Sequence, residues 1–284
     1  MQEKQSSTTA LGAAVLRALH QDLDRPPVFD DPLAMRITGE EERAAFSAQS
    51  PIPLTPDSPV VANMRGFLAA RSRYAEDALA VAVARGTRQY VVLGAGFDTF
   101  GYRNPHTALR VFEVDYPATQ VRKRELLAKA GIAIPPSLVY VPIDFEKETL
   151  DGALARAGLI RTEPVFFSWL GVTAYLTRDA VMGTLQFMST MAKGSEVVLD
   201  YMLDPQRFDA DSRAHFDKTA PRFRAVGEAF LSFFDPEPFA AEVKSLGFSG
   251  VESIESGALR EKYFRNRTDG LGVSSFGALL HARV

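Results

Sequence analysis

The chain has 284 residues, 46% of them hydrophobic and 24% charged, which is the balance of a globular protein and enough for one large α/β domain with a lid. A net charge of −3 argues against nucleic acid or phospholipid as the main partner, and the lack of cysteine excludes disulfides and cysteine-ligated metals. Residues 1–9 are polar and no apolar run is as long as a membrane span, so we expect a cytoplasmic protein without a membrane partner.

The first third of the chain is predicted to be helical. Apolar residues at helical spacing predict a helix over about 8–20, a short helix over 31–37 and a long one over 60–84. The segment 50–59 carries four prolines, so it cannot be helix or central strand and is suited to crossing a surface or covering a site. We interpret residues 1–84 as an N-terminal helical cap on the substrate side.

The most informative stretch predicts a strand, a glycine turn and a second strand. An apolar run over 90–93 stops at Gly94, Ala95 and Gly96, and a second run over 110–114 ends at Asp115. Glycine lacks a Cβ, so backbone there can approach a ligand closely. Asp115 follows Gly94 by 21 residues and could accept hydrogen bonds from both hydroxyls of a ribose. The pattern is half of a nucleotide-binding α/β unit.

Thr99 distinguishes between cofactors. A dinucleotide-binding fingerprint would have Gly or Ala at this position. The threonine found here favours a cofactor without phosphates, of which S-adenosylmethionine is the common one. A nicotinamide-dependent oxidoreductase shares the layout, but no Tyr-x-x-x-Lys or catalytic histidine setting supports it. A non-catalytic adenosine-binding protein would keep Asp115, and a plain glycine turn without ligand is the remaining alternative.

From residue 89 onward strands and helices alternate, which predicts an α/β fold with a mostly parallel sheet. We expect a Rossmann-like sheet of about seven strands with an antiparallel edge strand, helices on both faces and an aromatic, helical lid insertion at about 202–235 within a core of residues 85–284. Further strands are expected at 138–142, 164–169, 196–201, 250–256 and, on the edge, 274–284; helices at 117–130, 148–157, 178–192 and 235–246.

Ligands of such sheets bind outside the carboxyl ends of the strands. Asp144 and Phe145 follow the third predicted strand. Asp144 could accept from an adenine amino group, and Phe145 could pack on the ring or offer its backbone N–H. Turn or helix capping is the alternative role for Asp144, and N-capping of the helix after Pro117 is the alternative for Asp115.

Several segments together resemble one known family. They are L-G-A-G-F-D-T-F-G-Y-R at 93–103, F-E-V-D-Y-P at 112–117, R-K-R-E-L-L at 122–127 and G-V-T-A-Y-L-T at 171–177, with weaker N-terminal matches at 9–11, 29–34 and 69–73. Over nearly the whole chain the sequence is similar to the leucine carboxyl methyltransferase-like family of class I S-adenosylmethionine-dependent methyltransferases. Its bacterial branch is described as O-methyltransferases, some linked to polyketide or other secondary metabolism.

The resemblance implies a role for each matching cofactor residue. Arg71 would pair with the methionine carboxylate, with Arg73 as the alternative, because a guanidinium can bond a carboxylate with two N–H groups. Gly94 would approach the methionine moiety and Asp115 the ribose. Adenine would lie against Asp144 and Phe145.

One residue departs from the family pattern. The family often has Glu before the glycine of the loop after the fourth strand, and here the residues are Leu170 and Gly171. Backbone near Trp169 and Leu170 would then replace that carboxylate contact. In the glycine motif, Asp98 and Arg103 are expected to brace the loop by an internal ion pair.

The methyl acceptor is predicted to be a small, partly apolar molecule. Tyr175, Tyr201 and His215 are the candidates for shaping its pocket, and phenylalanines of the insertion would supply apolar surface. No evident general base follows a strand, which mildly favours a carboxyl or a pre-ionised phenol over other hydroxyls. We expect no metal ion and a monomer or homodimer.

Overall fold

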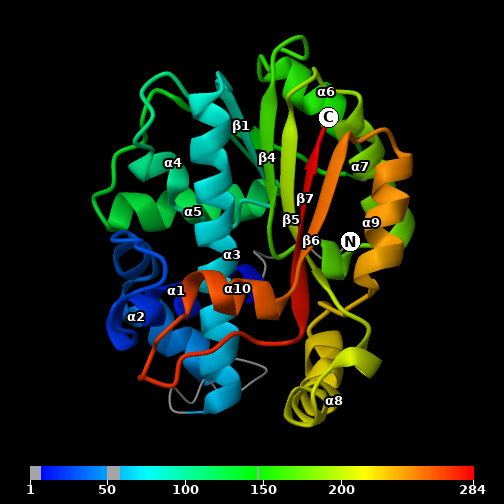
Figure 1. Ribbon diagram of the computed structural model, residues 1–284. Helices are drawn as coiled ribbons and strands as arrows, with labels where there is room; N and C mark the ends of the chain where they lie inside the picture. Colours follow the sequence, from blue (N-terminus) through cyan, green and yellow to red (C-terminus); the bar gives the residue numbers. More distant parts are fainter. Residues whose placement is uncertain (1–7, 50–57, 146) are drawn as a thin grey trace.

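A seven-stranded sheet forms the centre of the protein (Figure 1). The computed structural model describes residues 8–49, 58–145 and 147–284. The strand order is β3-β2-β1-β4-β5-β7-β6, and β7 runs in the direction opposite to that of the other strands. The strands are β1 (Gln89–Leu93), β2 (Arg110–Asp115), β3 (Leu138–Pro142), β4 (Val165–Trp169), β5 (Glu196–Met202), β6 (Gly250–Ile254) and β7 (Gly277–Arg283). The predicted fold class is therefore confirmed.

Strand burial and register bring the informative residues to one edge of the sheet. Every residue of β1 and of β4 is buried, as expected for apolar strands with neighbours on both sides. Leu93 lies opposite Val114 in the parallel register of β1 and β2. The glycine turn and Asp115 therefore emerge side by side at the carboxyl edge.

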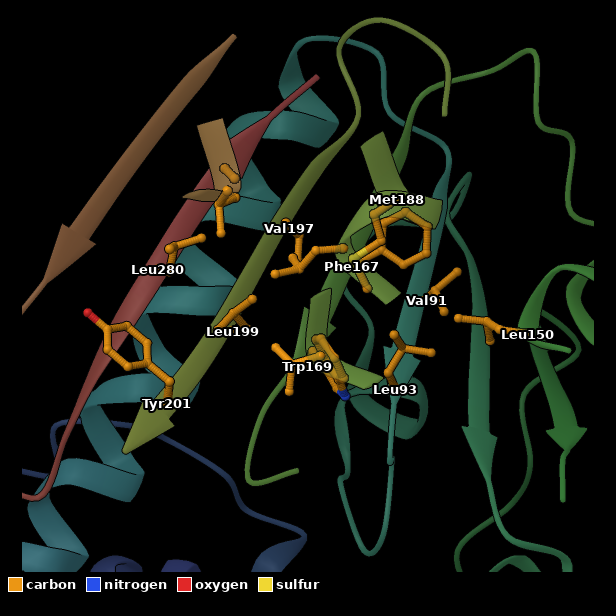
Figure 2. Close-up of a cluster of buried hydrophobic side chains, with 14 of the residues drawn as sticks. Val91, Leu93, Leu150, Phe167, Trp169, Met188, Val197, Leu199, Tyr201 and Leu280 are labelled. Carbon is orange, nitrogen blue, oxygen red and sulfur yellow. The ribbon is translucent and has the colours of Figure 1, made fainter. Parts of the chain in front are cut away.

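Helices cover both faces of the sheet. One core cluster packs β1, β4 and β5 against α6, α7 and α9, and Figure 2 shows its side chains along the sheet. The other face packs against α3, α4 and α10. The helices are α1 (Thr8–Leu23), α2 (Ala34–Gln49), α3 (Pro59–Ala84), α4 (Phe100–Arg103), α5 (Pro117–Lys129), α6 (Leu150–Arg156), α7 (Arg178–Ser189), α8 (Ala210–Ala225), α9 (Pro236–Ser245) and α10 (Ser256–Tyr263), with short 3₁₀ turns η1 (Thr173–Tyr175) and η2 (Pro205–Arg207).

The C-terminal strand was placed wrongly by the sequence. We expected it on the edge, but β7 lies between β5 and β6, so β6 is the edge strand. The reason is burial: Gly277 to Ala282 in β7 are all buried, whereas β6 is mostly half-exposed. A strand buried along both faces belongs inside a sheet.

Other differences concern the helical segments. The expected short helix at 31–37 continues as α2 to Gln49, interrupted at Gly39 by non-helical backbone. Helix α10 was not predicted. Residues 1–7 and most of the proline-rich stretch, residues 50–57, lie outside the described residues. No helix of the described ranges is long and apolar enough to cross a membrane.

A fully buried ion pair fixes α5 on β2. Lys123 of α5 donates to Glu113 of β2 at 2.7 Å, and both side chains are 1% exposed. Tyr102 also donates to Glu113, at 3.4 Å, and its hydroxyl lies 2.5 Å from that of Tyr140. Burial raises the pKa of Glu113 to about 7 although Lys123 opposes the shift. Removing either partner would leave the other charged group buried without a counter-ion, which would destabilise the fold.

We expect Lys123→Met to lower the free energy of unfolding by about 3–5 kcal/mol, because it leaves Glu113 buried without its counter-ion. Urea denaturation measures the change. The double variant Lys123→Met/Glu113→Gln should recover much of the loss, and Lys129→Met, at an exposed pair, should behave like the wild type. A single variant as stable as the wild type would show that the pair does not hold the helix.

Candidate cofactor and acceptor site

A cavity of about 730 Å³ opens at the carboxyl edge of the parallel strands. Its walls come from α1, α3, the glycine turn after β1, the loop after β4, the end of β5, and α8 with the segment that follows it. Figure 1 shows α1 and α8 at this same end of the sheet. Segments far apart in the sequence therefore enclose one space of the size that binds small ligands.

The glycine turn uses backbone that other residues adopt at a cost. Gly94 has φ +66°, in the left-handed region, and the N–H groups of Gly94 and Ala95 both donate to Val114 O, at 2.8 and 3.0 Å. A Cβ on Gly94 would meet a methyl carbon of Val172 at 2.4 Å. Gly94, Ala95 and Gly96 all line the cavity, as predicted for a turn that faces a ligand.

Asp115 lines the cavity beside this turn. Its Oδ2 accepts from Gly96 N at 2.5 Å and its Oδ1 from Tyr116 N at 2.6 Å. Burial raises the pKa of Asp115, and these backbone hydrogen bonds oppose the shift. The alternative role is wrong, since the N-cap of α5 is Tyr116. The carboxylate is thus oriented by backbone and keeps acceptor capacity for hydroxyl donors.

Arg71 lies deep in the cavity in a network that the sequence did not reveal. Its Nη1 pairs with Asp200 Oδ2, while Asp200 Oδ1 accepts from Gly171 N at 2.6 Å. The Arg71 and Asp200 side chains are only 12% and 10% exposed. Gly171 has φ +75°, and a Cβ there would meet Arg71 Nη2 at 2.9 Å. The alternative, Arg73, does not line the cavity and pairs with Asp77 at 2.8 Å.

Asp200 is the functional candidate that sequence reasoning missed. It lies near the end of β5, which reads E-V-V-L-D-Y-M, and an acid inside such an apolar strand was the available signal. Thr173 Oγ1 also donates to the main-chain oxygen of Asp200, at 2.6 Å. Strand β5, α3 and the loop after β4 are thereby joined at one carboxylate.

The predicted residues of the adenine site, Asp144 and Phe145, are not among those that line the cavity. Phe145 is 66% exposed, and Asp144 pairs with Lys147 at 2.9 Å. Trp169 is buried in the core next to Leu93 (Figure 2), whereas Leu170 lines the cavity. The roles of Asp144, Phe145 and Trp169 in cofactor binding stay predictions.

The expected ion pair within the glycine motif is wrong. Arg103 pairs with Glu76 of α3, with Nη1 2.8 Å from Oε2, and Asp98 accepts from Phe100 N at 2.8 Å. Asp98 caps a tight turn locally, while Arg103 ties the motif to α3. The loop is therefore braced from outside, by a helix that precedes it in the chain.

Aromatic rings line the other half of the cavity. On α8 the inward residues follow helical spacing, with His215, Phe216, Thr219 and Phe223 facing the space. Phe230 lies in the segment after α8. Its ring centroid is 5.4 Å from that of Tyr175, 5.7 Å from that of Phe216 and 5.3 Å from that of Phe223. The predicted aromatic insertion thus faces the site.

Two of the three candidate residues of the acceptor pocket, Tyr175 and Tyr201, differ in their contacts. Tyr175 stacks on Phe230, and burial raises its pKa. The hydroxyl of Tyr201 bonds to Ser253 Oγ, its ring packs on Phe234 and Phe239, and burial raises its pKa to about 12. Figure 2 shows the Tyr201 ring at the β7 side of the cluster. Tyr201 therefore lines the cavity with its hydroxyl already bonded to Ser253.

Helix α1 forms the wall of the cavity next to the glycine turn. Arg17 donates to Phe97 O at 2.6 Å and to Asp31 at 3.0 Å. At the other end of the helix, Thr9 N donates to Glu228, in the segment after α8, at 3.0 and 3.2 Å. The N-terminal helix therefore contacts both the glycine motif and the segment after α8. Among the described residues, no cluster of three or more His, Asp or Glu side chains could hold a metal ion.

Comparison with known proteins identifies the family of the chain. A model of the leucine carboxyl methyltransferase family matches residues 10–189. The chain is 32% identical over 306 residues to YktD of Bacillus subtilis, named a "Putative S-adenosyl-L-methionine-dependent methyltransferase", covering 99% of both. It is 31% identical over 283 residues to a protein of the same name from Mycobacterium sp. strain KMS, covering 90% of this chain and 89% of that one.

Solved structures share the fold. A DUF574 family protein from Streptomyces avermitilis has a TM-score of 0.54 at 18% identity, covering 95% of this chain and 96% of that one. A structure from Thermobifida fusca, titled a "putative methyltransferase", has a TM-score of 0.55 at 18% identity, covering 95% and 93%.

Fold, site and relatives together define an S-adenosylmethionine-dependent methyltransferase. The chain belongs to the leucine carboxyl methyltransferase family. This favours methyl transfer over the nicotinamide-dependent oxidoreductase and the non-catalytic binding protein that the strand–glycine–strand pattern had left open.

We expect Asp115→Ala to weaken S-adenosylmethionine binding by about 1.5–3 kcal/mol, the usual contribution of hydrogen bonds to a charged group. Isothermal titration calorimetry measures it. Asp179→Ala, which removes an exposed carboxylate from the first turn of α7, is the matched control. If both variants bind like the wild type, Asp115 does not contact the ribose.

Proposed function

We propose that the protein transfers a methyl group from S-adenosylmethionine to an oxygen of a small, partly apolar molecule, as in secondary metabolism. The observation that carries this proposal is the division of a single cavity. One half is polar, with Asp115, Arg71 and Asp200, and the other half is aromatic, built by α8, Tyr175 and Phe230. A polar cofactor and an apolar acceptor would meet where the halves join.

The polar half fits the charges of the cofactor. Asp115 suits the ribose hydroxyls, Arg71 the methionine carboxylate and Asp200 the methionine ammonium group. Asp200 thereby supplies a carboxylate near the position where Leu170 stands in place of the family glutamate. When bound, S-adenosylmethionine supplies a methyl group whose bond to sulfur breaks, with both electrons left on sulfur, as a bond to the acceptor oxygen forms.

The protein's own contribution is position and exclusion of water. In-line displacement needs the acceptor oxygen held in line with the methyl carbon and the sulfur. A rigid, closed cavity favours this arrangement. The Thr9–Glu228 contact between α1 and the lid segment supports such closure.

We expect tritium from methyl-labelled S-adenosylmethionine to appear in solvent-extractable small molecules when the purified protein acts on a panel of apolar acids and aryl hydroxyls. Alkali then releases label from esters but leaves ethers intact, which tells carboxyl from hydroxyl acceptors. Heat-inactivated protein is the control. Label found only in acid-precipitated protein would contradict a small-molecule acceptor.

Ligand dissection tests the assignment of Asp200 and Arg71. We expect Asp200→Asn to lose about 1.5–3 kcal/mol of binding free energy for S-adenosylmethionine but little for 5′-methylthioadenosine, which lacks the amino-acid head group. Arg71→Lys should show the same selectivity, because an ammonium cannot reproduce the guanidinium fork. Equal losses for both ligands would indicate general damage to the site instead.

A further inference from the structure

We propose that the acceptor is a neutral aromatic hydroxyl and that His215 accepts its proton as general base. The proposal rests on the proposed O-methyl transfer and narrows its substrate class. It begins from the place of His215, which the sequence predicted as a candidate for shaping the acceptor pocket.

His215 faces the aromatic half of the cavity. It lies on the inward stripe of α8 with Phe216, Thr219 and Phe223, and its ring is 6.1 Å from that of Phe276. Within the described ranges neither ring nitrogen of His215 makes a hydrogen bond. The neighbouring hydroxyl of Thr219 donates to the main-chain oxygen of His215 at 2.8 Å. A half-buried imidazole thus presents free nitrogens among aromatic rings.

The surroundings of His215 keep the imidazole neutral. Burial lowers its pKa, and Lys218 on the same helix lowers it further. A neutral imidazole can accept a proton at pH 7, which a protonated one cannot. Tyr175 cannot take this role because its raised pKa keeps its hydroxyl protonated. The other titratable side chains of the cavity lining are Arg17, Arg71, Asp98, Asp115, Asp200, Tyr201 and Glu228.

The charges of the lining disfavour an ionised carboxylate as acceptor. The cations among the described lining residues are Arg17, bonded to Asp31 and Phe97 O, and Arg71, paired with Asp200. An acceptor carboxylate in the aromatic half would be desolvated without a counter-ion of its own. A neutral ring carrying a hydroxyl could instead stack on Phe230 and Phe216, which suits aromatic packing.

The transfer balances with this assignment. The acceptor oxygen gains the methyl carbon and loses its proton, and a free ring nitrogen of His215 takes that proton. The imidazolium then returns the proton to water. The products are an aryl methyl ether and a neutral thioether, so no further reactant is needed.

The decisive comparison pairs two acceptors with one substitution. His215→Gln should lower kcat on 2-naphthol, whose hydroxyl is protonated at neutral pH, by roughly 10²–10⁴-fold. A nitro-substituted naphthol that is already ionised at the assay pH needs no base, so the variant should lose less than tenfold on it. His106→Gln, the same change outside the cavity lining, is the control and should match the wild type. Equal losses on both naphthols, or no loss on 2-naphthol, would overturn the role of His215.

Two further measurements separate the inference from the proposed function. In protein without cofactor, the NMR signal that His215→Gln removes should titrate below the usual histidine range and shift when 2-naphthol is added; an unresponsive signal contradicts the proposal. Wild-type protein that binds S-adenosylmethionine and methylates aryl carboxylates but no aryl hydroxyl refutes the inference and leaves O-methyl transfer standing. Protein that does not bind S-adenosylmethionine refutes both.

Discussion

The carboxylate of Asp200 organises the base of the cavity. It pairs with Arg71 of α3 and accepts from the backbone of Gly171 after β4, and it belongs to β5 itself. Both charged side chains are about nine-tenths buried, so each depends on the other for charge balance. Because the three segments come from different thirds of the chain, this contact positions α3 relative to the sheet edge at which the cavity opens.

The fold was predictable because its signals are local. The β-branched and aromatic runs of β1 and β4, the glycine turn at Gly94 and the proline that begins α5 each specify one element and its ends. The place of β7 was not predictable in the same way, since strand order depends on which residues share a buried face. The burial of Gly277 to Ala282, among which His281 is the one polar side chain, is a property of the whole sheet.

The residues of the site also divide into those with local signals in the sequence and those without. Gly94, Gly96 and Asp115 lie within one local motif, and the structure brings them together as the motif implies. Asp200 was missed because its role comes from contacts with residues 29 and 129 positions away. Arg103 was assigned the wrong partner for the same reason: its acid, Glu76, lies 27 residues upstream on α3. Long-range charge pairing leaves little trace in a single sequence.

The two halves of the cavity differ in a way that suits the two chemically different ligands that we propose. In the polar half each charged side chain already has a partner or a backbone donor, as Asp115 has in Gly96 N. Charged groups of a ligand can therefore take the place of these existing contacts. In the aromatic half the rings around Phe230 carry no charge, and His215 is kept neutral by the same desolvation. A low-dielectric pocket beside a charged one supports the neutral acceptor that we propose, since neither its binding nor the release of its ether moves a net charge through the aromatic wall.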